Sequence, residues 1–432
     1  MTGMRVGVIG AGYVGLTTAV CLAERGHPTI CVDVDGRRVD ELNRGTTQLD
    51  EPELPLLLRR GLAAETLRFS ADYGELADRA LVFVCVPTPS RFDGSADLSA
   101  VEAAVGELAG LLPSGAVLVL KSTVPVGTTR QLARRLTPTG IKVVSNPEFL
   151  REGHAVYDFR HPDRVVLGAD DDGAADVVAG VYGESAPTLR MSPESAELAK
   201  YASNAFLAVK VSYANSLARL CAGVGADVGD VTGCMGADVR IGDHFLQPGP
   251  GWGGSCLPKD TAALLHTARQ AGVALPEVES ARGTNAAQPA HIATVLSRVM
   301  ATPLSDARVT VLGLTFKAGT SDVRDSPALA ICAELARTGA QITGYDPRLG
   351  QIDQGVLRRS SLVTVDDPYL AAKDADAIVV LTEWPEFRRL NWPLIAEQSP
   401  GAVVVDTRNL LDPASLADTG LTYLGNGLPS GY

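Results

Sequence analysis

The fold is indicated by residues 5–34, which read RVGVIGAGYVGLTTAVCLAERGHPTICVDV. An apolar run at 5–9 leads into a glycine turn, and helix formers at 14–25 lead into a second apolar run at 29–34. Short apolar strands that alternate with helix-length segments are typical of parallel strands joined by helical crossovers. We therefore expect the chain to begin with a doubly wound α/β domain.

The same alternation returns near the C-terminus. Further strand candidates share an apolar, buried character and lie at 81–86, 116–121, 142–145, 308–316, 341–347, 377–381 and 402–406. From about residue 194 to residue 223 helix formers dominate without internal Gly or Pro, which predicts one long helix. We expect an α/β protein with two doubly wound, Rossmann-like parallel-sheet domains joined by a long central helix and a helical region. The expected domain ranges are 1–190 for an N-terminal dinucleotide domain, 191–300 for the helical part and 301–432 for a C-terminal α/β domain.

Length and composition are those of a globular protein. The chain has 432 residues, which allows two or three domains, and 46% of them are hydrophobic and 20% charged. No apolar run approaches the roughly 20 residues that span a bilayer. The formal charge of -12 disfavours nucleic acid as a partner. The N-terminus enters a strand-like run without the basic and apolar regions of a signal peptide, so we expect a cytoplasmic protein that binds no membrane.

One cysteine differs from the others. The seven cysteines are odd in number and include no CxxC pair, which argues against a disulfide framework, a zinc site or another metal centre. Cys256 lies in GPGWGGSCLPKD (249–260), ahead of a helix expected from about Thr261. A helix N-terminus and the nearby Lys259 lower a thiol pKa, so Cys256 is the candidate nucleophile. The alternative is a cysteine that only fills a loop. The others have apolar neighbours and are expected in the core: Cys21, Cys31, Cys85, Cys221, Cys234 and Cys332.

The glycine turn predicts a dinucleotide site. Gly10, Gly12 and Gly15 follow a strand and open a helix, where a pyrophosphate meets the helix amides. Asp33 ends the second strand 18 residues after Gly15, at the place of a carboxylate that accepts the adenosine ribose hydroxyls. That carboxylate repels a 2'-phosphate, which favours NAD over NADP. Arg38 weakens this preference because it is able to pair with a phosphate.

The long helix carries a second candidate pair. Lys200 and Asn204 are one helical turn apart and share a face, where an ammonium and an amide can stabilise an oxyanion. The alternative is that Glu197 pairs with Lys200 as a solvated ion pair.

Together these residues resemble the UDP-glucose/GDP-mannose dehydrogenase family. The segments that carry the resemblance follow the family's order along nearly the whole chain: GAGYVG (10–15), VPTP (86–89), KSTVPVGTT (121–129), NPEFLREG (146–153), ELAKYASNAFLAVK (197–210), RIGDHFLQPGPGWGGSCLPKD (240–260), GLTFKAGTSDVRDSP (313–327) and DTRN (406–409). The resemblance implies oxidation of the C6 alcohol of UDP-glucose to UDP-glucuronate with two NAD+ reduced. A thiolate at Cys256 adds to the intermediate aldehyde, and the thiohemiacetal is oxidised to a thioester that water cleaves.

The resemblance also implies roles for residues within the matching segments. The catalytic set comprises Cys256, Lys200, Asn204, Asp260, Thr123, Glu148 and Glu152. The expected NAD contacts are Gly10, Gly12, Tyr13, Val14, Gly15, Asp33, Arg38, Thr88, Thr123, Glu152, Lys259 and Arg324. The expected substrate contacts are Glu148, Phe149, Leu150, Arg151, Glu152, Lys200, Asn204, Arg240, Phe245, Leu246, Gln247, Pro248, Gly249, Gly253, Lys317 and Arg408.

Several alternatives stay open at the level of sequence. Gln247 and Trp252 leave the base undecided, so dTDP-glucose and GDP-mannose compete with UDP-glucose. The first general base is open between a carboxylate acting through water and a lysine. A two-electron dehydrogenase and a non-catalytic sensor of nucleotide sugar are further readings. Arg240 matches an arginine that reaches into a neighbouring subunit in the family, which implies a homodimer or a higher homo-oligomer.

Overall fold

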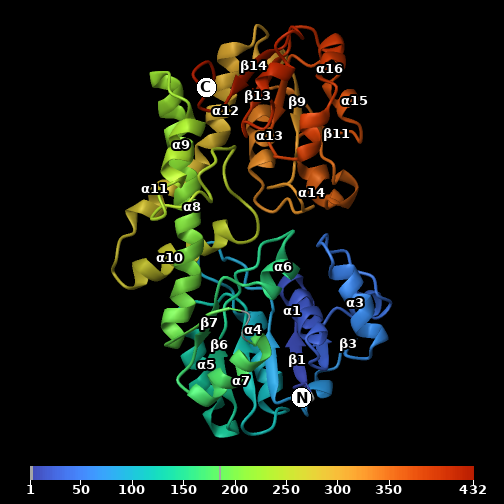
Figure 1. Cartoon of the computed structure of the whole chain (residues 1–432), viewed down its shortest axis with the longest axis vertical. Helices are drawn as coiled ribbons and strands as arrows, with labels where there is room; N and C mark the ends of the chain where they lie inside the picture. The colour runs from blue at the N-terminus through green and yellow to red at the C-terminus, as the bar shows by residue number, and fades with distance from the viewer. Residues whose placement is uncertain (1–2, 184–185) are drawn as a thin grey trace. The chain divides into compact units, whose positions relative to one another are not determined.

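The computed structural model describes residues 3–183 and 186–432, which form two compact units. The first unit runs to Ser203 and includes Ala262–Val273; the second unit comprises Asn204–Thr261 and Ala274–Tyr432. Two helices contribute residues to both units: α8 (Pro193–Val224) and α10 (Leu257–Gln270). The long helix expected near 194–223 is α8, which Figure 1 shows as one continuous element.

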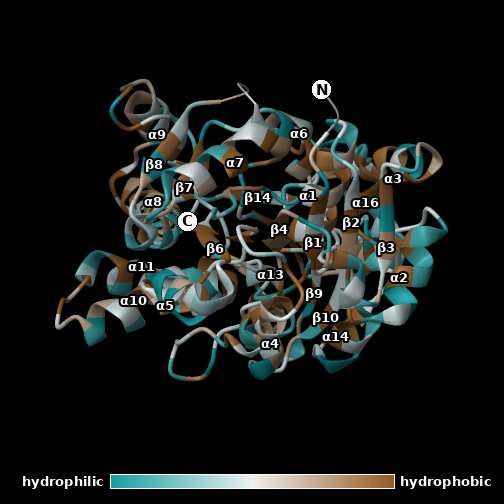
Figure 2. Ribbon diagram, turned by 90° about the horizontal axis from the view of Figure 1, so that it is seen from below, coloured by the Kyte–Doolittle hydropathy of each residue, from teal (hydrophilic) through white to brown (hydrophobic). Residues whose placement is uncertain are grey.

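The first unit is built on one sheet. Its described strands, in spatial order, are β3 (Leu67–Ser70), β2 (Thr29–Val32), β1 (Val6–Ile9), β4 (Leu81–Val84), β5 (Val117–Leu120), β6 (Lys142–Ser145), β7 (Val165–Gly168) and β8 (Thr188–Met191). Its helices include α1 (Tyr13–Glu24), α2 (Gly36–Asn43), α3 (Leu54–Ala63), α4 (Ser99–Ala109), α5 (Thr128–Leu136), α6 (Ala155–Arg160) and α7 (Asp172–Tyr182). All four residues of β1 and of β4 are buried, as expected for central strands covered on both faces, and their ribbon is mainly hydrophobic in Figure 2.

The sheet of the first unit is not parallel throughout. β3 to β6 run parallel, but β6 and β7 pair antiparallel through Ser145 and Gly168, and β7 and β8 are parallel to each other. The expected doubly wound sheet is therefore present with two reversed strands at one edge. Strand direction depends on the connection between strands, which apolar runs do not reveal.

The second unit contains a fully parallel sheet. Its described strands are ordered β11 (Val363–Thr364), β10 (Gln341–Tyr345), β9 (Arg308–Leu312), β12 (Ala377–Val380), β13 (Val403–Asp406) and β14 (Thr422–Gly425). Its helices include α9 (Val228–Gly236), α11 (Pro276–Ala286), α12 (Gln288–Val299), α13 (Pro327–Arg337), α14 (Gln354–Arg359), α15 (Pro368–Ala372) and α16 (Trp392–Gln398). The two Rossmann-like sheets confirm the predicted fold class. Among the described helices, none is both long and apolar enough to cross a bilayer.

The cysteines mostly follow their expected burial. Cys21, Cys31, Cys85, Cys221 and Cys332 are buried, as predicted. The prediction was wrong for Cys234, which is exposed on α9. Only Val228 and Thr232 of this helix are buried, so an apolar sequence context did not bring the thiol into the core.

Candidate active site

The glycine turn between β1 and α1 has the geometry of a dinucleotide loop. Gly10 has φ +92°, and a Cβ on it would lie 2.7 Å from the carbonyl oxygen of Cys85. A Cβ on Gly15 would lie 1.7 Å from the carbonyl oxygen of Gly10, whereas a Cβ on Gly12 would meet no atom within 4 Å. Gly12 precedes α1 and supplies no side-chain cap. Open space therefore lies beside amide groups at a helix N-terminus, which fits a pyrophosphate.

Asp33 lies where the second strand ends, next to this loop. Its side chain is buried, and its carboxylate accepts the amides of Ala11 at 2.6 Å and Asp35 at 2.9 Å. Arg38 donates to the same carboxylate at 3.1 Å and is itself half exposed. An acceptor held against the glycine loop fits an adenosine ribose, so the residues present fit NAD.

Tyr13 connects α1 to the loop that carries Glu152. Its hydroxyl donates to the carboxylate of Glu51, and the amide of Gly153 donates to Glu51 at 2.8 Å. Burial and the bond to Glu51 raise the pKa of Tyr13 above its usual value. Glu51 is 4% exposed and was not predicted, because no local motif marks a carboxylate whose partners are 38 and 102 residues away.

Two expected site residues meet after β4 and β5. Thr88 Oγ1 donates to the carbonyl oxygen of Thr123 at 2.8 Å, and both side chains are buried. The end of a strand in a doubly wound sheet is the usual place for ligand contacts. The structure thus brings an expected cofactor residue and an expected catalytic residue together.

Lys200 pairs with Glu148. Its Nζ lies 3.1 Å from a carboxylate oxygen of Glu148 and 5.2 Å from the ring centroid of Phe149, and both charged side chains are buried. The amide of Leu150 also donates to Glu148, at 2.6 Å. Burial by itself raises the pKa of Glu148, but Lys200, the Leu150 amide and Lys121 outweigh it, so that the pKa lies below its usual value. The carboxylate is therefore ionised at neutral pH.

The alternative partner for Lys200 was wrong. Glu197 accepts the amide of Gly127 at 2.6 Å, the amide of Thr129 at 2.7 Å and the hydroxyl of Thr129 at 2.6 Å. These groups belong to the start of α5, 68 to 70 residues away in sequence. A three-residue spacing on a helix favours a local ion pair, and only the fold reveals the distant amides.

Cys256 immediately precedes α10. Its carbonyl oxygen accepts the amide of Asp260 at 2.9 Å, and the side chain is partly exposed. The helix begins at Leu257, four residues before the expected Thr261, because Pro258 is tolerated in a first turn. Ser255 Oγ lies 3.5 Å from the thiol sulfur. The positive end of a helix favours the thiolate.

Asp260 joins two other expected catalytic or cofactor residues in the second unit. Its fully buried carboxylate accepts Asn204 Nδ2 at 2.6 Å and Lys259 Nζ at 2.5 Å. Lys259 therefore neutralises Asp260 one turn from the thiol. The carboxylate also fixes the amide of Asn204, so its carbonyl oxygen and nitrogen are not interchangeable in this position.

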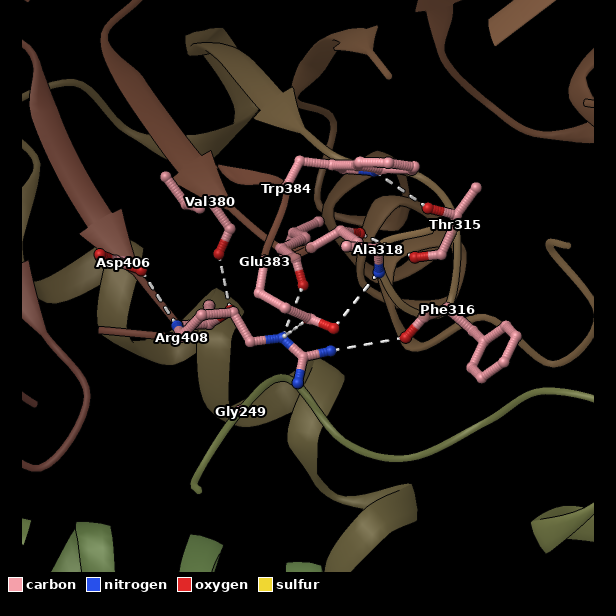
Figure 3. Close-up of polar contacts among 12 residues, drawn as sticks. Gly249, Thr315, Phe316, Ala318, Val380, Glu383, Trp384, Asp406 and Arg408 are labelled. Atoms are coloured by element: carbon pink, nitrogen blue, oxygen red, sulfur yellow. Dashed lines mark hydrogen bonds and ion pairs between the residues drawn. The ribbon is translucent and has the colours of Figure 1, made fainter. Parts of the chain in front are cut away.

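Gly249 and Arg408 meet at the second sheet. The amide of Gly249 donates to Asn215 at 2.7 Å, and Gln288 donates to its carbonyl oxygen at 3.0 Å. A Cβ on Gly249 would lie 2.8 Å from a terminal guanidinium nitrogen of Arg408, which Figure 3 shows directed toward this backbone. Gly249 is buried and its peptide is fixed on both sides, so the group that suits a phosphate oxygen here is the guanidinium of Arg408.

Arg408 is held in place by groups that were not predicted. Its Nε lies 3.1 Å from the carbonyl oxygen of Leu381 and 3.1 Å from the carboxylate of Glu383 (Figure 3). Glu383 also accepts the amide of Ala318 at 3.3 Å, next to Lys317. Glu383 thus connects the backbone beside one expected substrate residue to the side chain of another.

The rest of the glycine loop packs against its neighbours. Trp252 is buried, and its indole donates to Ser212 of α8 at 2.8 Å. A Cβ on Gly253 would lie 1.9 Å from the carbonyl oxygen of Asp325. Trp252 therefore has a packing role inside the second unit, which sequence reading had not assigned.

The remaining expected residues differ in their exposure. Phe245 and Gln247 are exposed, whereas Leu246 and Pro248 are buried. Other side chains form surface ion pairs: Arg240 with Asp238 at 2.5 Å, Arg324 with Asp322 at 2.6 Å and Arg151 with Asp158 at 2.6 Å. For these three arginines the structure supplies a carboxylate partner that sequence analysis did not anticipate.

Comparison with known proteins matches all parts of this arrangement to one family. Residues 4–186 match the NAD binding domain of the UDP-glucose/GDP-mannose dehydrogenase family, residues 194–287 its central domain and residues 310–413 its UDP binding domain. These matches confirm NAD as the expected cofactor.

Individual relatives are similar over almost the full chain. The chain is 41% identical to a UDP-glucose 6-dehydrogenase of Rhizobium meliloti, covering 99% of this chain and 100% of the relative. It is 42% identical to a UDP-glucose 6-dehydrogenase of Pseudomonas aeruginosa, covering 99% and 98%. A solved UDP-glucose dehydrogenase from Pyrobaculum islandicum superposes with a TM-score of 0.87 at 35% identity, covering 99% and 98%. The chain therefore belongs to the UDP-glucose/GDP-mannose dehydrogenase family of NAD-dependent enzymes.

Proposed function

We propose that this enzyme oxidises the C6 alcohol of UDP-glucose to the carboxylate of UDP-glucuronate. The observation that carries the proposal is Cys256 at the start of α10, with the buried Asp260 in the first turn held by Asn204 and Lys259. A nucleophile at the positive end of a helix supports covalent capture of an aldehyde, which a two-electron dehydrogenase does not need. The names of the similar proteins support the choice of UDP-glucose.

The first oxidation removes a proton and a hydride from the C6 alcohol. NAD+, when bound, accepts the hydride. Glu148 is ionised and buried, so it is suited to accept the proton directly or through water, and Lys200 stabilises both the carboxylate and the developing oxyanion. Thr123 and Glu152 are proposed to orient the reacting group and its water.

The second oxidation proceeds on Cys256. The thiolate adds to the aldehyde carbon and the carbonyl oxygen takes a proton, giving a thiohemiacetal. This adduct loses a proton, and a hydride to a second NAD+, to give a thioester. Water then attacks the thioester, with Asp260 as the proposed base, so that the carboxylate leaves and the thiol is restored. Asn204, whose amide is fixed by Asp260, is proposed to donate to the oxyanions of these steps.

Substrate binding is proposed for the second unit. Arg408 and Lys317 supply positive charge for the sugar and the diphosphate, and the loop 245–249 supplies backbone groups for the base and phosphates. The fixed peptide of Gly249 beside the guanidinium of Arg408 supports this assignment. The match of residues 310–413 to a UDP binding domain supports uridine as the base.

We also propose a homodimer built on α8. Large side chains with apolar surface are exposed from its middle to its end: Phe206 (63%), Tyr213 (53%), Leu220 (59%) and Val224 (68%). The first three recur every seven residues, which is the spacing of a helix seam. Arg240, with an 85% exposed side chain, is proposed to serve the neighbouring subunit. The three matched ranges support the division at 1–190, 191–300 and 301–432, and we propose the cytoplasm as the location.

A panel of nucleotide sugars tests the function. NADH formed per sugar consumed is measured with UDP-glucose, dTDP-glucose, GDP-mannose and UDP-N-acetylmannosamine under saturating NAD+. We expect two NADH per UDP-glucose and the highest kcat/KM for it. One NADH per sugar with release of free aldehyde contradicts the four-electron reaction, and faster turnover of another sugar contradicts the substrate.

A further inference from the structure

We infer that Glu197 is a positioning residue: by capping the start of α5 it holds α8 in the register that keeps Lys200 beside Glu148. The inference rests on the proposed function, in which Lys200 and Glu148 serve the first oxidation. It concerns residues of the first unit only. Glu197 itself is 2% exposed and is assigned no contact with substrate or coenzyme.

The cap is a tertiary one. α5 begins after Gly127, whose φ of +94° suits glycine and which has no side chain to cap the helix. The first amides of a helix lack partners within the helix. Glu197 on α8 supplies acceptors for two of these amides: its carboxylate accepts hydrogen bonds from the amides of Gly127 and Thr129, and also from the hydroxyl of Thr129. A carboxylate at a helix N-terminus also interacts favourably with the helix dipole.

The bonding pattern requires a charged acceptor. All three partners donate, and a carboxylate has acceptor oxygens only. A glutamine at this position would direct its NH2 group at a backbone N–H or give up one of the bonds. Burial raises the pKa of Glu197 above its usual value, and the bonds from the hydroxyl and amide of Thr129 and the amide of Gly127 oppose this shift without cancelling it. The cap therefore depends on both the charge and the length of this side chain.

The cap bears on the reaction because of its spacing from Lys200. The two side chains are three residues apart on α8, so one helical turn carries a bond to the start of α5 and the ion pair to Glu148. α5 follows the segment that contains Thr123, whose carbonyl oxygen is bound by Thr88. Glu197 thus connects the helix that carries one expected catalytic residue to the segment that carries another.

The same helix provides a matched control. Glu194 lies three residues before Glu197 and pairs with Arg130 Nε at 3.1 Å, with a third of its side chain exposed. This pair also joins α8 to α5, but it is a surface contact and makes none of the buried amide bonds. Exposed ion pairs contribute little to stability, so Glu194→Gln removes an equal charge with little expected effect.

The experiment compares Glu197→Gln and Thr129→Val with Glu194→Gln and the unmodified enzyme. Steady-state rates are measured for UDP-glucose and NAD+ at temperatures well below each Tm. A misplacement of about 1 Å costs up to about 100-fold in rate, so we expect kcat of Glu197→Gln to fall about 10- to 100-fold while both KM values change less than about threefold. Thr129→Val loses only the hydroxyl bond, so its kcat is expected to fall less. The double variant Glu197→Gln with Thr129→Val is expected to have a kcat no lower than that of Glu197→Gln.

A second readout does not depend on turnover. Lys200 is labelled with trinitrobenzene sulfonate and quantified by peptide mass spectrometry. In Glu197→Gln the loosened ion pair exposes the amine, and labelling accelerates several-fold, whereas Glu194→Gln labels like the unmodified enzyme. The pH profile of kcat is a third readout, because Glu148 is faced by two lysines: Lys200 from α8 and Lys121 from the end of β5. A weaker contact with Lys200 moves the acidic limb to higher pH.

The outcomes separate the two proposals. Failure of the unmodified enzyme to oxidise UDP-glucose overturns the proposed function, and labelling of Lys200 still decides the role of Glu197. Equal kcat, equal labelling and an unshifted pH profile in Glu197→Gln and Glu194→Gln overturn the positioning role. If Glu197→Gln does not fold, Thr129→Val decides: normal labelling of Lys200 in that variant contradicts the inference.

Discussion

Lys200 Nζ lies 3.1 Å from the carboxylate of Glu148, and neither side chain is more than 8% exposed. Removing one partner of a buried pair leaves a charge without compensation, which costs about 3–5 kcal/mol. Lys200 is therefore the first of the groups that keep Glu148 ionised, ahead of the Leu150 amide and Lys121.

Lys200→Met is expected to destabilise the enzyme in a pH-dependent way. In the unmodified enzyme the pKa of Glu148 is lowered, so its contribution to stability is present above the unfolded pKa and is lost as the pH falls through the folded pKa. Without Lys200, burial raises that pKa, and the deficit is largest at pH 7 and smaller near pH 5. Urea unfolding at both pH values measures this. Glu148→Gln combined with Lys200→Met is the control, and a deficit equal at both pH values contradicts the prediction.

Cys256→Ser is expected to slow formation of the acid by at least about 1000-fold, because a serine hydroxyl is not ionised at neutral pH and lacks thiolate nucleophilicity. NADH and UDP-glucuronate are measured per sugar consumed. Cys234→Ser, which alters an exposed thiol of α9, serves as the matched control and keeps full activity. Two NADH per sugar from Cys256→Ser would refute the thioester.

Alkylation at pH 8 is expected to sort the thiols by their surroundings. Burial raises the pKa of Cys21, Cys85 and Cys332 to about 12, so these thiols remain protonated and react slowly. Cys256, at a helix N-terminus, and the exposed Cys234 are expected to react first. Iodoacetamide labelling followed by peptide mass spectrometry checks this order, and early labelling of Cys85 would contradict it.

Asp33→Asn is expected to weaken discrimination between NAD+ and NADP+. The substitution removes the charge that repels a 2'-phosphate and releases Arg38, which lies 3.1 Å away. Because juxtaposed like charges cost several kcal/mol, the ratio of kcat/KM for NAD+ over NADP+ falls at least about tenfold. Adding Arg38→Ala should restore part of the ratio. If the NAD+/NADP+ ratio of kcat/KM is unchanged in Asp33→Asn, the adenosine ribose does not bind at Asp33.

Phe206→Glu combined with Tyr213→Glu is expected to yield monomers if α8 forms the dimer seam. Both side chains are more than half exposed, and burying a charge in an apolar interface is costly. Light scattering after size-exclusion chromatography measures the mass. Leu370→Glu, at a 62% exposed position of α15, is the control and leaves the mass unchanged. If the double variant is still a dimer, this face of α8 is not the dimer interface.

Much of the architecture follows from local pattern. The apolar runs predict β1, β2, β4, β5 and β6 to within two residues, because buried parallel strands need continuous apolar sequence. The reversal of β7 and β8 lay beyond this reasoning, since pairing direction depends on connections. The start of α10 was misplaced because Pro258 resembles a helix breaker while occupying a first turn.

The sequence motifs predicted the residues of the site but not the residues that hold them in place. Asp33 and the glycines were predicted from spacing, and their contacts agree with that assignment. Glu51, Glu383 and the true partners of Glu197 were not, because each acts through groups far away in sequence. A carboxylate that binds distant backbone amides cannot be recognised in a single sequence, because nearly every residue has a backbone amide and none marks the partner.

The loop that ends at Cys256 also limits how such an enzyme can diversify. Gly249 is fixed through its peptide by Asn215 and Gln288, and Gly253 lies too close to Asp325 for any side chain. A substitution at Gly249 or Gly253 would displace the loop that positions Cys256, so we expect such substitutions to be selected against. Under the proposed binding of the base by the loop 245–249, the exposed Gln247 upstream is a position where a substitution meets no such packing constraint.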